Sequence, residues 1–187
     1  MKIIKRHLDK SEYTRSKIPL ERVTGIVIHF TDSATTTFSR NAEWLYEFLN
    51  YNRPARQRHA SYHYAIDQDG ATYEFIPPNE CAWHAGPTNL TRPNITETLN
   101  GRPNWSTIGI SFLHPSPDGK PTPETYQSLV ELTVELCNKF KINEDNVFRH
   151  FDCTGKDCPR YFVNNEQEWV MFKTNVKARL FINSGGV

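Results

Sequence analysis

Short apolar runs alternate with amphipathic stretches along most of the chain. The run GIVIHFT, residues 25 to 31, is rich in β-branched residues and predicts a buried strand with His29 near its carboxyl end. Residues 106 to 113 predict another strand, and residues 146 to 151 predict a shorter one that carries His150. Residues 60 to 77 contain two strand-like runs separated by the turn residues QDG, which predicts a β-hairpin.

Apolar residues recur at helical spacing between these strands. Residues 38 to 50 place four apolar side chains on one face: Phe38, Ala42, Leu45 and Leu49. A longer helix is predicted from the N-cap Thr122 and Pro123, with a stripe formed by Tyr126, Leu129, Val130, Thr133, Cys137 and Phe140. The last helix follows Asn165, with a stripe formed by Trp169, Phe172, Val176 and Leu180. The interleaved elements predict an α/β fold with a mixed central β-sheet flanked by helices.

Two stretches show neither the apolar runs of a strand nor the apolar spacing of a helix. Residues 86 to 106 are rich in Gly, Pro, Asn and Thr. A loop this long is more often a binding or lid element than filler, although an idle surface excursion is the alternative. The residues NSGGV, 183 to 187, are linker-like. We therefore expect one domain over residues 1 to 182, followed by a short tail.

The length and net charge of the chain limit the number of domains and the kinds of binding partner to be expected. A chain of 187 residues supports one good hydrophobic core. The formal net charge of +1 provides no basic field for nucleic acid or anionic membranes. No apolar run reaches the length of a membrane span, and charges interrupt residues 1 to 17 before a signal-peptide core could form. We expect a chain made in the cytoplasm that binds no nucleic acid and does not insert into a membrane.

The stretch RHFDCTGKDCPRYF, residues 149 to 162, gathers four reactive side chains: His150, Cys153, Lys156 and Cys158. It could be a disulfide loop, a structural metal clip or half of a catalytic site. Without an export signal, four cysteines are more typical of free thiols or metal ligands than of a disulfide framework. A closed structural zinc site needs paired C-x-x-C motifs, whereas this chain has a single C-x4-C spacing.

A catalytic zinc site needs only three protein ligands and leaves one position for water. His29 near the end of one predicted strand, His150 in another and Cys158 in the following loop can meet at one edge of a sheet. Each histidine taken alone could equally be an ordinary core or surface residue.

Five short motifs occur in a characteristic order: VIHFT (27 to 31), SYHYAIDQDG (61 to 70), AWHAG (82 to 86), TIGISF (107 to 112) and RHFDCTGKDCP (149 to 159). Together they resemble the zinc-dependent N-acetylmuramoyl-L-alanine amidases of the amidase-2 family, which includes phage endolysins and animal peptidoglycan recognition proteins. The resemblance covers about residues 20 to 182. It implies an amidase-2 fold and cleavage of the amide between N-acetylmuramic acid and L-alanine in bacterial peptidoglycan.

The resemblance also implies roles for individual residues. One zinc ion per chain would be held by three residues: His29, His150 and Cys158. Lys156 matches the family's K-x-C lysine and would stabilise the oxyanion of the reacting carbonyl, the alternative being a solvated loop lysine. His84 of AWHAG would line the cleft and hydrogen-bond the muropeptide, with Trp83 packed beneath it.

The sequence departs from one branch of the family at the catalytic acid/base. That branch carries IGIE, whereas Ser111 stands in place of the glutamate and cannot perform its proton transfer at neutral pH. The branch with a small residue there places a tyrosine on the hairpin, which corresponds to Tyr62. Strand alternation would put Tyr62 and Tyr64 on one face and His63 on the other, so Tyr62 and His63 should not both face the metal. The resemblance implies that Tyr62 is the one that does. The alternative is that Tyr62 packs on the core.

The other histidines, His7, His59 and His114, match no motif and are expected in surface or loop positions. Cys137 is expected in the core, and Cys81 and Cys153 have no assigned role.

Three biological roles fit the resemblance. The first is a bacteriolytic phage endolysin, released through a holin-type opening in the membrane and continued beyond the tail by a C-terminal wall-binding domain. The second is a cytoplasmic amidase that recycles soluble muropeptides. The third is a recognition module that binds peptidoglycan without cutting it, although Cys158 retained with both histidines argues against this role. The linker-like tail and the absent glutamate favour the endolysin.

Overall fold

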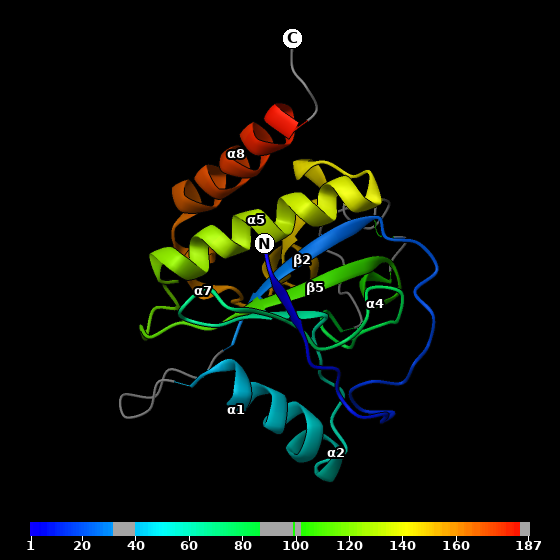
Figure 1. Ribbon diagram of the computed structural model, residues 1–187. Helices are drawn as coiled ribbons and strands as arrows, with labels where there is room; N and C mark the ends of the chain where they lie inside the picture. Colours follow the sequence, from blue (N-terminus) through cyan, green and yellow to red (C-terminus); the bar gives the residue numbers. More distant parts are fainter. Residues whose placement is uncertain (32–39, 87–98, 100–101, 184–187) are drawn as a thin grey trace.

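A mixed β-sheet of six strands forms the centre of the computed structural model, which describes residues 1–31, 40–86, 99 and 102–183 (Figure 1). The strands are β1 (Ile3–Lys5), β2 (Gly25–Phe30), β3 (Tyr64–Ile66), β4 (Thr72–Glu74), β5 (Thr107–Phe112) and β6 (Val147–Arg149). Their order across the sheet is β1-β4-β3-β5-β2-β6. This architecture confirms the predicted α/β fold with a mixed sheet.

Strand β2 lies at the parallel centre of the sheet. It pairs in parallel with β5 on one side and with β6 on the other, and β5 pairs in parallel with β3. All six residues of β2 are buried, as expected for an apolar strand covered on both faces. Strands β3 and β4 pair antiparallel and confirm the predicted hairpin. Because parallel strands end at a common edge, the carboxyl ends of β2, β5 and β6 meet there.

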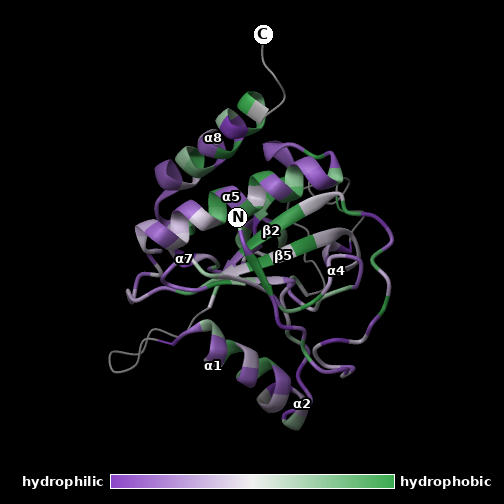
Figure 2. Ribbon diagram, in the orientation of Figure 1, coloured by the Kyte–Doolittle hydropathy of each residue, from purple (hydrophilic) through white to green (hydrophobic). Residues whose placement is uncertain are grey.

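Three helices cover one face of the sheet: α5 (Pro123–Phe140), α7 (Arg160–Asn164) and α8 (Glu166–Asn183) (Figure 1). Thr122 caps α5 as predicted, because its hydroxyl accepts the Thr125 backbone N–H. The main hydrophobic core lies between these helices and the sheet and includes Ile26, Ile28, Ile108, Ile110, Leu129, Phe162, Phe172 and Val176. The apolar strands stand out in Figure 2. Removing this surface from water is the main contribution to the stability of the fold.

The opposite face of the sheet is covered by α1 (Ala42–Glu47), which continues through a π-helical segment (Phe48–Asn52) into α2 (Arg53–Ala55). A second core cluster forms here from Leu45, Leu49, Ala65, Phe75 and Leu113. The helix predicted over 38 to 50 therefore exists, although residues 38 and 39 lie outside the described residues. Asn41 caps α1 by accepting the Trp44 backbone N–H.

Three local predictions need correction. Strand β6 ends at Arg149, so the predicted strand position of His150 is wrong, and His150 instead begins helix α6 (His150–Thr154). The cause is Asp152, whose carboxylate accepts the Arg149 backbone N–H at 2.8 Å and turns the chain into a helix. Strand β1 was not predicted. Helix α4 (Pro103–Ser106) interrupts the segment predicted to be irregular over 86 to 106, of which residues 87–98, 100 and 101 lie outside the described residues.

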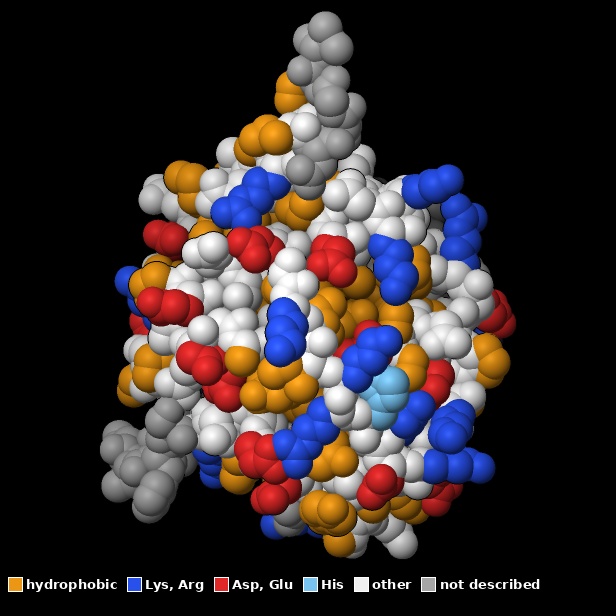
Figure 3. Space-filling view, in the orientation of Figure 1, with side chains coloured by type: hydrophobic (Ala, Val, Ile, Leu, Met, Phe, Trp, Pro, Cys, Tyr) orange, Lys and Arg blue, Asp and Glu red, His pale blue; other side chains and the backbone are white. Residues whose placement is uncertain are grey.

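Acidic and basic side chains are interspersed on the face shown in Figure 3, which agrees with the near-zero net charge. Within the described part of the chain, no helix is both long enough and apolar enough to cross a membrane. The tail from residue 184 onward lies outside the described residues.

Candidate metal centre

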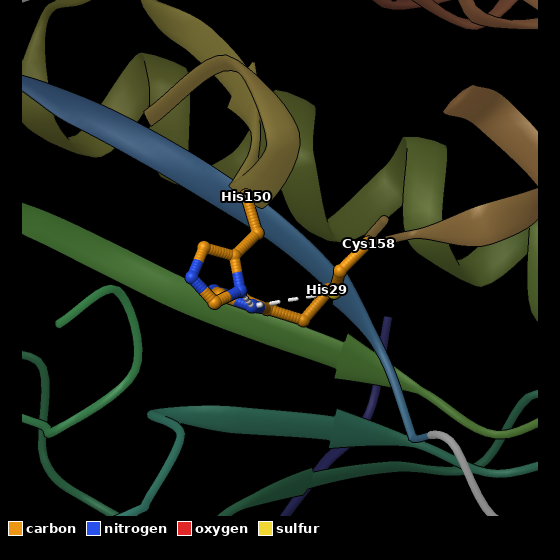
Figure 4. A group of neighbouring side chains, drawn as sticks. All are labelled: His29, His150 and Cys158. Atoms are coloured by element: carbon orange, nitrogen blue, oxygen red, sulfur yellow. Dashed lines mark hydrogen bonds between the residues drawn. The ribbon is translucent and has the colours of Figure 1, made fainter. Parts of the chain in front are cut away.

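His29 meets His150 and Cys158, which lie 121 and 129 residues further along the chain, at the carboxyl edge of β2 and β6 (Figure 4). The β2–β6 register pairs Ile28 with Arg149, so the next residues along, His29 and His150, lie side by side. Cys158 arrives from the loop after α6, where its backbone carbonyl accepts the Phe151 N–H at 2.8 Å. The sheet register and this loop contact together bring the three predicted ligands into one group.

The potential ligand atoms lie close enough to share one ion. His29 Nδ1 is 3.1 Å from His150 Nδ1 and 3.8 Å from Cys158 Sγ. One donor atom from each of the three residues lies within 4.8 Å of the others. All three side chains are buried, at 1%, 8% and 3% exposure for His29, His150 and Cys158. The group can therefore hold a metal ion.

Both candidate histidine ligands favour the neutral form that metal binding requires. Burial lowers the pKa of His29 well below its ordinary value, with further lowering by His150, His84 and Lys156. Burial, followed by the nearby Lys156 ammonium, lowers the pKa of His150 to about 4. At neutral pH each ring therefore has one unprotonated nitrogen available as a ligand.

A cleft of about 670 Å³ opens beside this group. Its lining residues come from the α2 region, the segment before β3, the AWHAG segment, α4 and α6, and include Arg53, Tyr62, Trp83, His84, His150 and Lys156. No Asp or Glu is among the described residues that line it. Lys156 is exposed at this cleft, so its ammonium is free to approach a bound molecule.

Tyr62 lies directly against the candidate ligands. Its ring centroid is 5.2 Å from that of His29. Burial, and then the nearby Cys158, raises the pKa of the Tyr62 phenol, so it stays protonated at neutral pH. The predicted strand alternation is wrong here: β3 begins only at Tyr64, which packs in the core under α5, while Tyr62 packs on the opposite face with the α1 cluster.

His63 has a structural environment. Its Nδ1 accepts the Gly109 backbone N–H at 2.9 Å, and its Nε2 lies 2.9 Å from the Glu80 carbonyl oxygen, to which it donates. Burial lowers the pKa of His63 to about 4. Both ring nitrogens are thus used within the protein, and His63 is not among the described residues that line the cleft.

Trp83 and His84 form one wall of the cleft. Trp83 donates its indole N–H to the Glu12 carbonyl at 2.9 Å, and its ring lies between those of His59 and Trp105. His84 is buried at 6% exposure, and both of its ring nitrogens lie near protein atoms. Both ring nitrogens of His84 therefore have partners within the protein.

The remaining histidines and cysteines differ in their surroundings. His114, expected in a surface or loop position, lies in the loop after β5 but is buried at 3% exposure, because its ring stacks on Phe30 and its nitrogens meet the carbonyls of Ser116 and Thr31. His59 is exposed and lines the cleft, and His7 bonds Glu74. All four cysteines are free, and Cys137 lies in the core as predicted. Cys153 packs with Val27, Leu99 and Phe148.

Sequence reasoning also missed Arg53 and Asn104, which line this cleft. The guanidinium of Arg53 stacks over Phe48, and its buried Nε has no hydrogen-bond partner among the described residues. The side-chain oxygen of Asn104 accepts the backbone N–H groups of His84 and Ala85. Nothing in the sequence around Arg53 indicates its position. Asn104 follows Pro103 inside the segment read as a binding loop, which was the only available signal.

Comparison with known proteins identifies relatives along most of the chain. Residues 19–161 match the family model Amidase_2, described as N-acetylmuramoyl-L-alanine amidase. The N-acetylmuramoyl-L-alanine amidase CwlL of Bacillus licheniformis is 32% identical over 181 residues, which are 96% of this chain and 48% of that protein. BlyA of Bacillus subtilis strain 168, also named as such an amidase, is 30% identical over 93% of this chain and 46% of its own length. The chain spans about half the length of these relatives.

Solved structures share the fold. The structure of PlyL superposes with a TM-score of 0.73 at 22% identity and covers 95% of this chain and 98% of its own. The catalytic domain of XlyA gives a TM-score of 0.72 at 24% identity, with coverage of 94% and 99%. At these identities the likeness establishes the fold alone.

Proposed function

Because the chain belongs to the Amidase_2 family of N-acetylmuramoyl-L-alanine amidases, we propose that it hydrolyses the amide between N-acetylmuramic acid and the L-alanine of the peptidoglycan stem peptide. The observation that carries the proposal is the buried group of His29, His150 and Cys158 beside an open cleft. A recognition module that only binds peptidoglycan would have no use for three converging metal ligands.

The three residues fit a zinc ion. Zn–N bonds of about 2.0–2.1 Å and a Zn–S bond of about 2.3 Å, at tetrahedral angles, place two nitrogens about 3.3 Å apart and a nitrogen and a sulfur about 3.6 Å apart. The corresponding distances here, 3.1 Å and 3.8 Å, agree within a few tenths of an ångström. Two imidazoles and one thiolate also leave a fourth position open, as catalytic zinc sites do. These observations support one zinc ion per chain.

When bound, zinc would supply Lewis-acid activation of a water molecule and of the amide carbonyl. The chain's own side chains act around the carbonyl. The Lys156 ammonium faces the cleft and stabilises negative charge that develops on the carbonyl oxygen. The protonated Tyr62 phenol, beside His29, donates a hydrogen bond to the reacting group. Ser111 has no carboxylate and cannot serve as the acid/base that the glutamate provides in the other branch.

Trp83 and His84 contribute the wall on which the glycan or the first stem residues rest. Trp83 lines the cleft, and its aromatic ring suits the carbon-bound hydrogens of a sugar or an alanine methyl group. His84 lines the same wall. The cleft volume of about 670 Å³ is within the range of small-ligand sites and would admit one such segment.

The biological role is proposed to be that of a bacteriolytic endolysin acting on the cell wall. One structure of similar fold is described as a mutant endolysin from Bacillus subtilis, with a TM-score of 0.72 at 24% identity. The curated relatives are about twice as long as this chain, which leaves room in such proteins for a further domain of the wall-binding kind. A muropeptide-recycling amidase is the alternative, and the choice of substrate separates the two.

The proposal is tested with the purified chain, its His150→Ala variant and a control, His7→Ala, whose histidine lies outside the cleft. Zinc content and new L-alanine amino termini released from purified cell walls are measured for each. We expect about one zinc per chain and release of termini in the parent and the control, and loss of both in His150→Ala. Binding to walls without any release of termini by the zinc-loaded parent would refute the amidase. Cleavage of soluble muropeptides but not of intact walls would refute the endolysin role.

A further inference from the structure

The ring nitrogen of His29 that faces away from the metal group is the start of a buried hydrogen-bonded chain. His29 Nε2 lies 3.1 Å from His84 Nδ1. The other nitrogen of His84, Nε2, lies 3.4 Å from the Thr107 carbonyl oxygen and 3.3 Å from the Thr107 hydroxyl oxygen. The Thr107 hydroxyl in turn lies 2.6 Å from the Pro103 carbonyl oxygen. The chain thus links β2, the AWHAG segment, β5 and α4.

The Thr107–Pro103 contact fixes which groups donate and which accept along this series of hydrogen bonds. A carbonyl oxygen can only accept, so the Thr107 hydroxyl donates its single proton to Pro103. Toward His84 the Thr107 hydroxyl and carbonyl oxygens are therefore both acceptors. His84 Nε2 must carry the proton, because an unprotonated Nε2 would face two acceptors and leave three buried polar atoms without a donor.

The proton on His84 Nε2 in turn determines which nitrogen of His29 is protonated. His84 is 6% exposed and no carboxylate contacts it among the described residues, so the charged imidazolium is disfavoured and Nδ1 keeps a lone pair. His29 must then donate from Nε2. Its Nδ1 is left unprotonated and faces His150 Nδ1 and Cys158 Sγ.

We propose that His84 is a positioning residue, which holds His29 in its Nε2-protonated tautomer so that the Nδ1 lone pair points at the metal position. The inference rests on the proposed metal site. A hydrogen bond from the outer nitrogen of a metal-bound histidine fixes ring orientation and tautomer, and its loss typically weakens metal binding about 10- to 100-fold. His84 therefore acts through His29 rather than by touching the reacting atoms.

The surroundings of His84 are shaped for this position. A side chain at Gly109 is excluded, because its Cβ would lie 2.6 Å from His84 Cγ. The His84 ring can therefore pack flat against β5 only because residue 109 is glycine. The side-chain oxygen of Asn104 accepts the backbone N–H groups of His84 and Ala85 at 3.0 Å and 2.8 Å, which anchors the segment that carries the ring.

The first test measures the tautomer of His29 directly in the metal-free parent protein, by long-range proton–nitrogen NMR correlations of the histidine rings. We expect a protonated Nε2 and an unprotonated Nδ1 in both rings. In His29 the Nε2 proton points to His84, and in His84 the Nε2 proton points to Thr107. A His29 ring protonated at Nδ1 overturns the inference. Because this measurement needs no zinc, it remains decisive even if the parent proves to bind none, a result that would refute the proposed function instead.

The second test compares three variants of His84 by zinc affinity, measured by competition with a chromogenic chelator. Asparagine can place its side-chain oxygen where Nδ1 stood and still accept from His29. Glutamine reaches only toward Thr107, and leucine can neither accept from His29 nor donate to Thr107. We expect His84→Asn to bind zinc within about threefold of the parent, and His84→Leu and His84→Gln to bind about 10- to 100-fold more weakly.

The inference fails if His84→Leu binds zinc within about twofold of the parent, or if His84→Asn is as weak as His84→Leu. Circular dichroism verifies that each variant folds. Should His84→Leu fail to fold, the comparison of His84→Asn with His84→Gln and the tautomer of the parent decide between the outcomes.

Discussion

The sharpest stability prediction concerns Asp152, which organises the turn that presents His150. Its carboxylate accepts the Arg149 backbone N–H at 2.8 Å and contacts the Arg149 guanidinium through NH2 at 2.9 Å and Nε at 3.1 Å. Arg149 and Asp152 are buried, at 5% and 7% side-chain exposure. The substitution Asp152→Asn keeps the shape and one acceptor oxygen but removes the negative charge.

The magnitude follows from the burial of the pair. Removing one partner of a buried ion pair costs about 3–5 kcal/mol, because the other charge is left uncompensated. Glu166 also contacts the guanidinium, but its side chain is 64% exposed and compensates only in part. We therefore expect a loss near the lower end, about 3 kcal/mol in the free energy of unfolding. At about 2–4 °C per kcal/mol for a protein of this size, the midpoint temperature falls by roughly 6–12 °C.

The assay is urea and thermal denaturation of the metal-free protein in a chelator, so that zinc binding does not contribute to the difference. A matched control is Asp157→Asn, in the same loop, because Asp157 is 53% exposed and pairs with the partly exposed Arg160. This control should change stability by less than about 0.5 kcal/mol. Equal stability of Asp152→Asn and the parent, or equal losses in the two variants, would refute the reasoning that burial sets the cost.

Three further predictions concern the site and its supports. Tyr62→Phe should lower turnover at least about tenfold with zinc content unchanged; unaffected turnover, together with abolition of cleavage in a folded His63→Ala, would show that the wrong residue was chosen. Cys153→Ala should lower the free energy of unfolding by about 1 kcal/mol through lost packing, and a loss of zinc would instead assign this thiol to the metal. Burial lowers the pKa of His63 to about 4 in the folded protein. The stability that neutral His63 contributes is therefore fully present above pH 6.5 and is lost as pH falls from 6.5 toward 4. In urea titrations of the metal-free protein over that range, His63→Gln should reduce the slope of stability against pH by up to about 1.4 kcal/mol per pH unit, and an unchanged slope would contradict this account.

Much of the fold follows from local patterns in the sequence. The buried run of β2, the capped helix α5 and the amphipathic α8 carry their periods and end signals within each segment, and the structure confirms all three. The edge strand β1 escaped prediction because only Ile3 and Ile4 distinguish it and its pairing with β4 is a long-range contact. The end of β6 at Arg149 depends on the side chain of Asp152, which strand periodicity does not register.

For the candidate site, too, some features could be predicted from the sequence and others could not. The three candidate ligands and Lys156 could be named from motifs in the sequence, and the structure places them together. The choice of Tyr62 over His63 rested on the family resemblance. The strand alternation that would put the two side chains on opposite faces does not apply, because the strand begins at Tyr64. The tertiary structure supplies a different reason, since both nitrogens of His63 are occupied by Gly109 and Glu80.

The sequence by itself determined most of the longer strands and helices, which residue types could bind a metal, and the family to which the chain belongs. These properties depend on side-chain chemistry and on apolar residues that recur every two to four positions. Both can be read from short segments of the sequence. Only the tertiary structure decided that His29 and His150 stand side by side, because their distance depends on the β2–β6 register. It likewise decided that His84 turns its nitrogens inward to His29 and Thr107, because hydrogen-bond partners far apart in the chain meet only after folding.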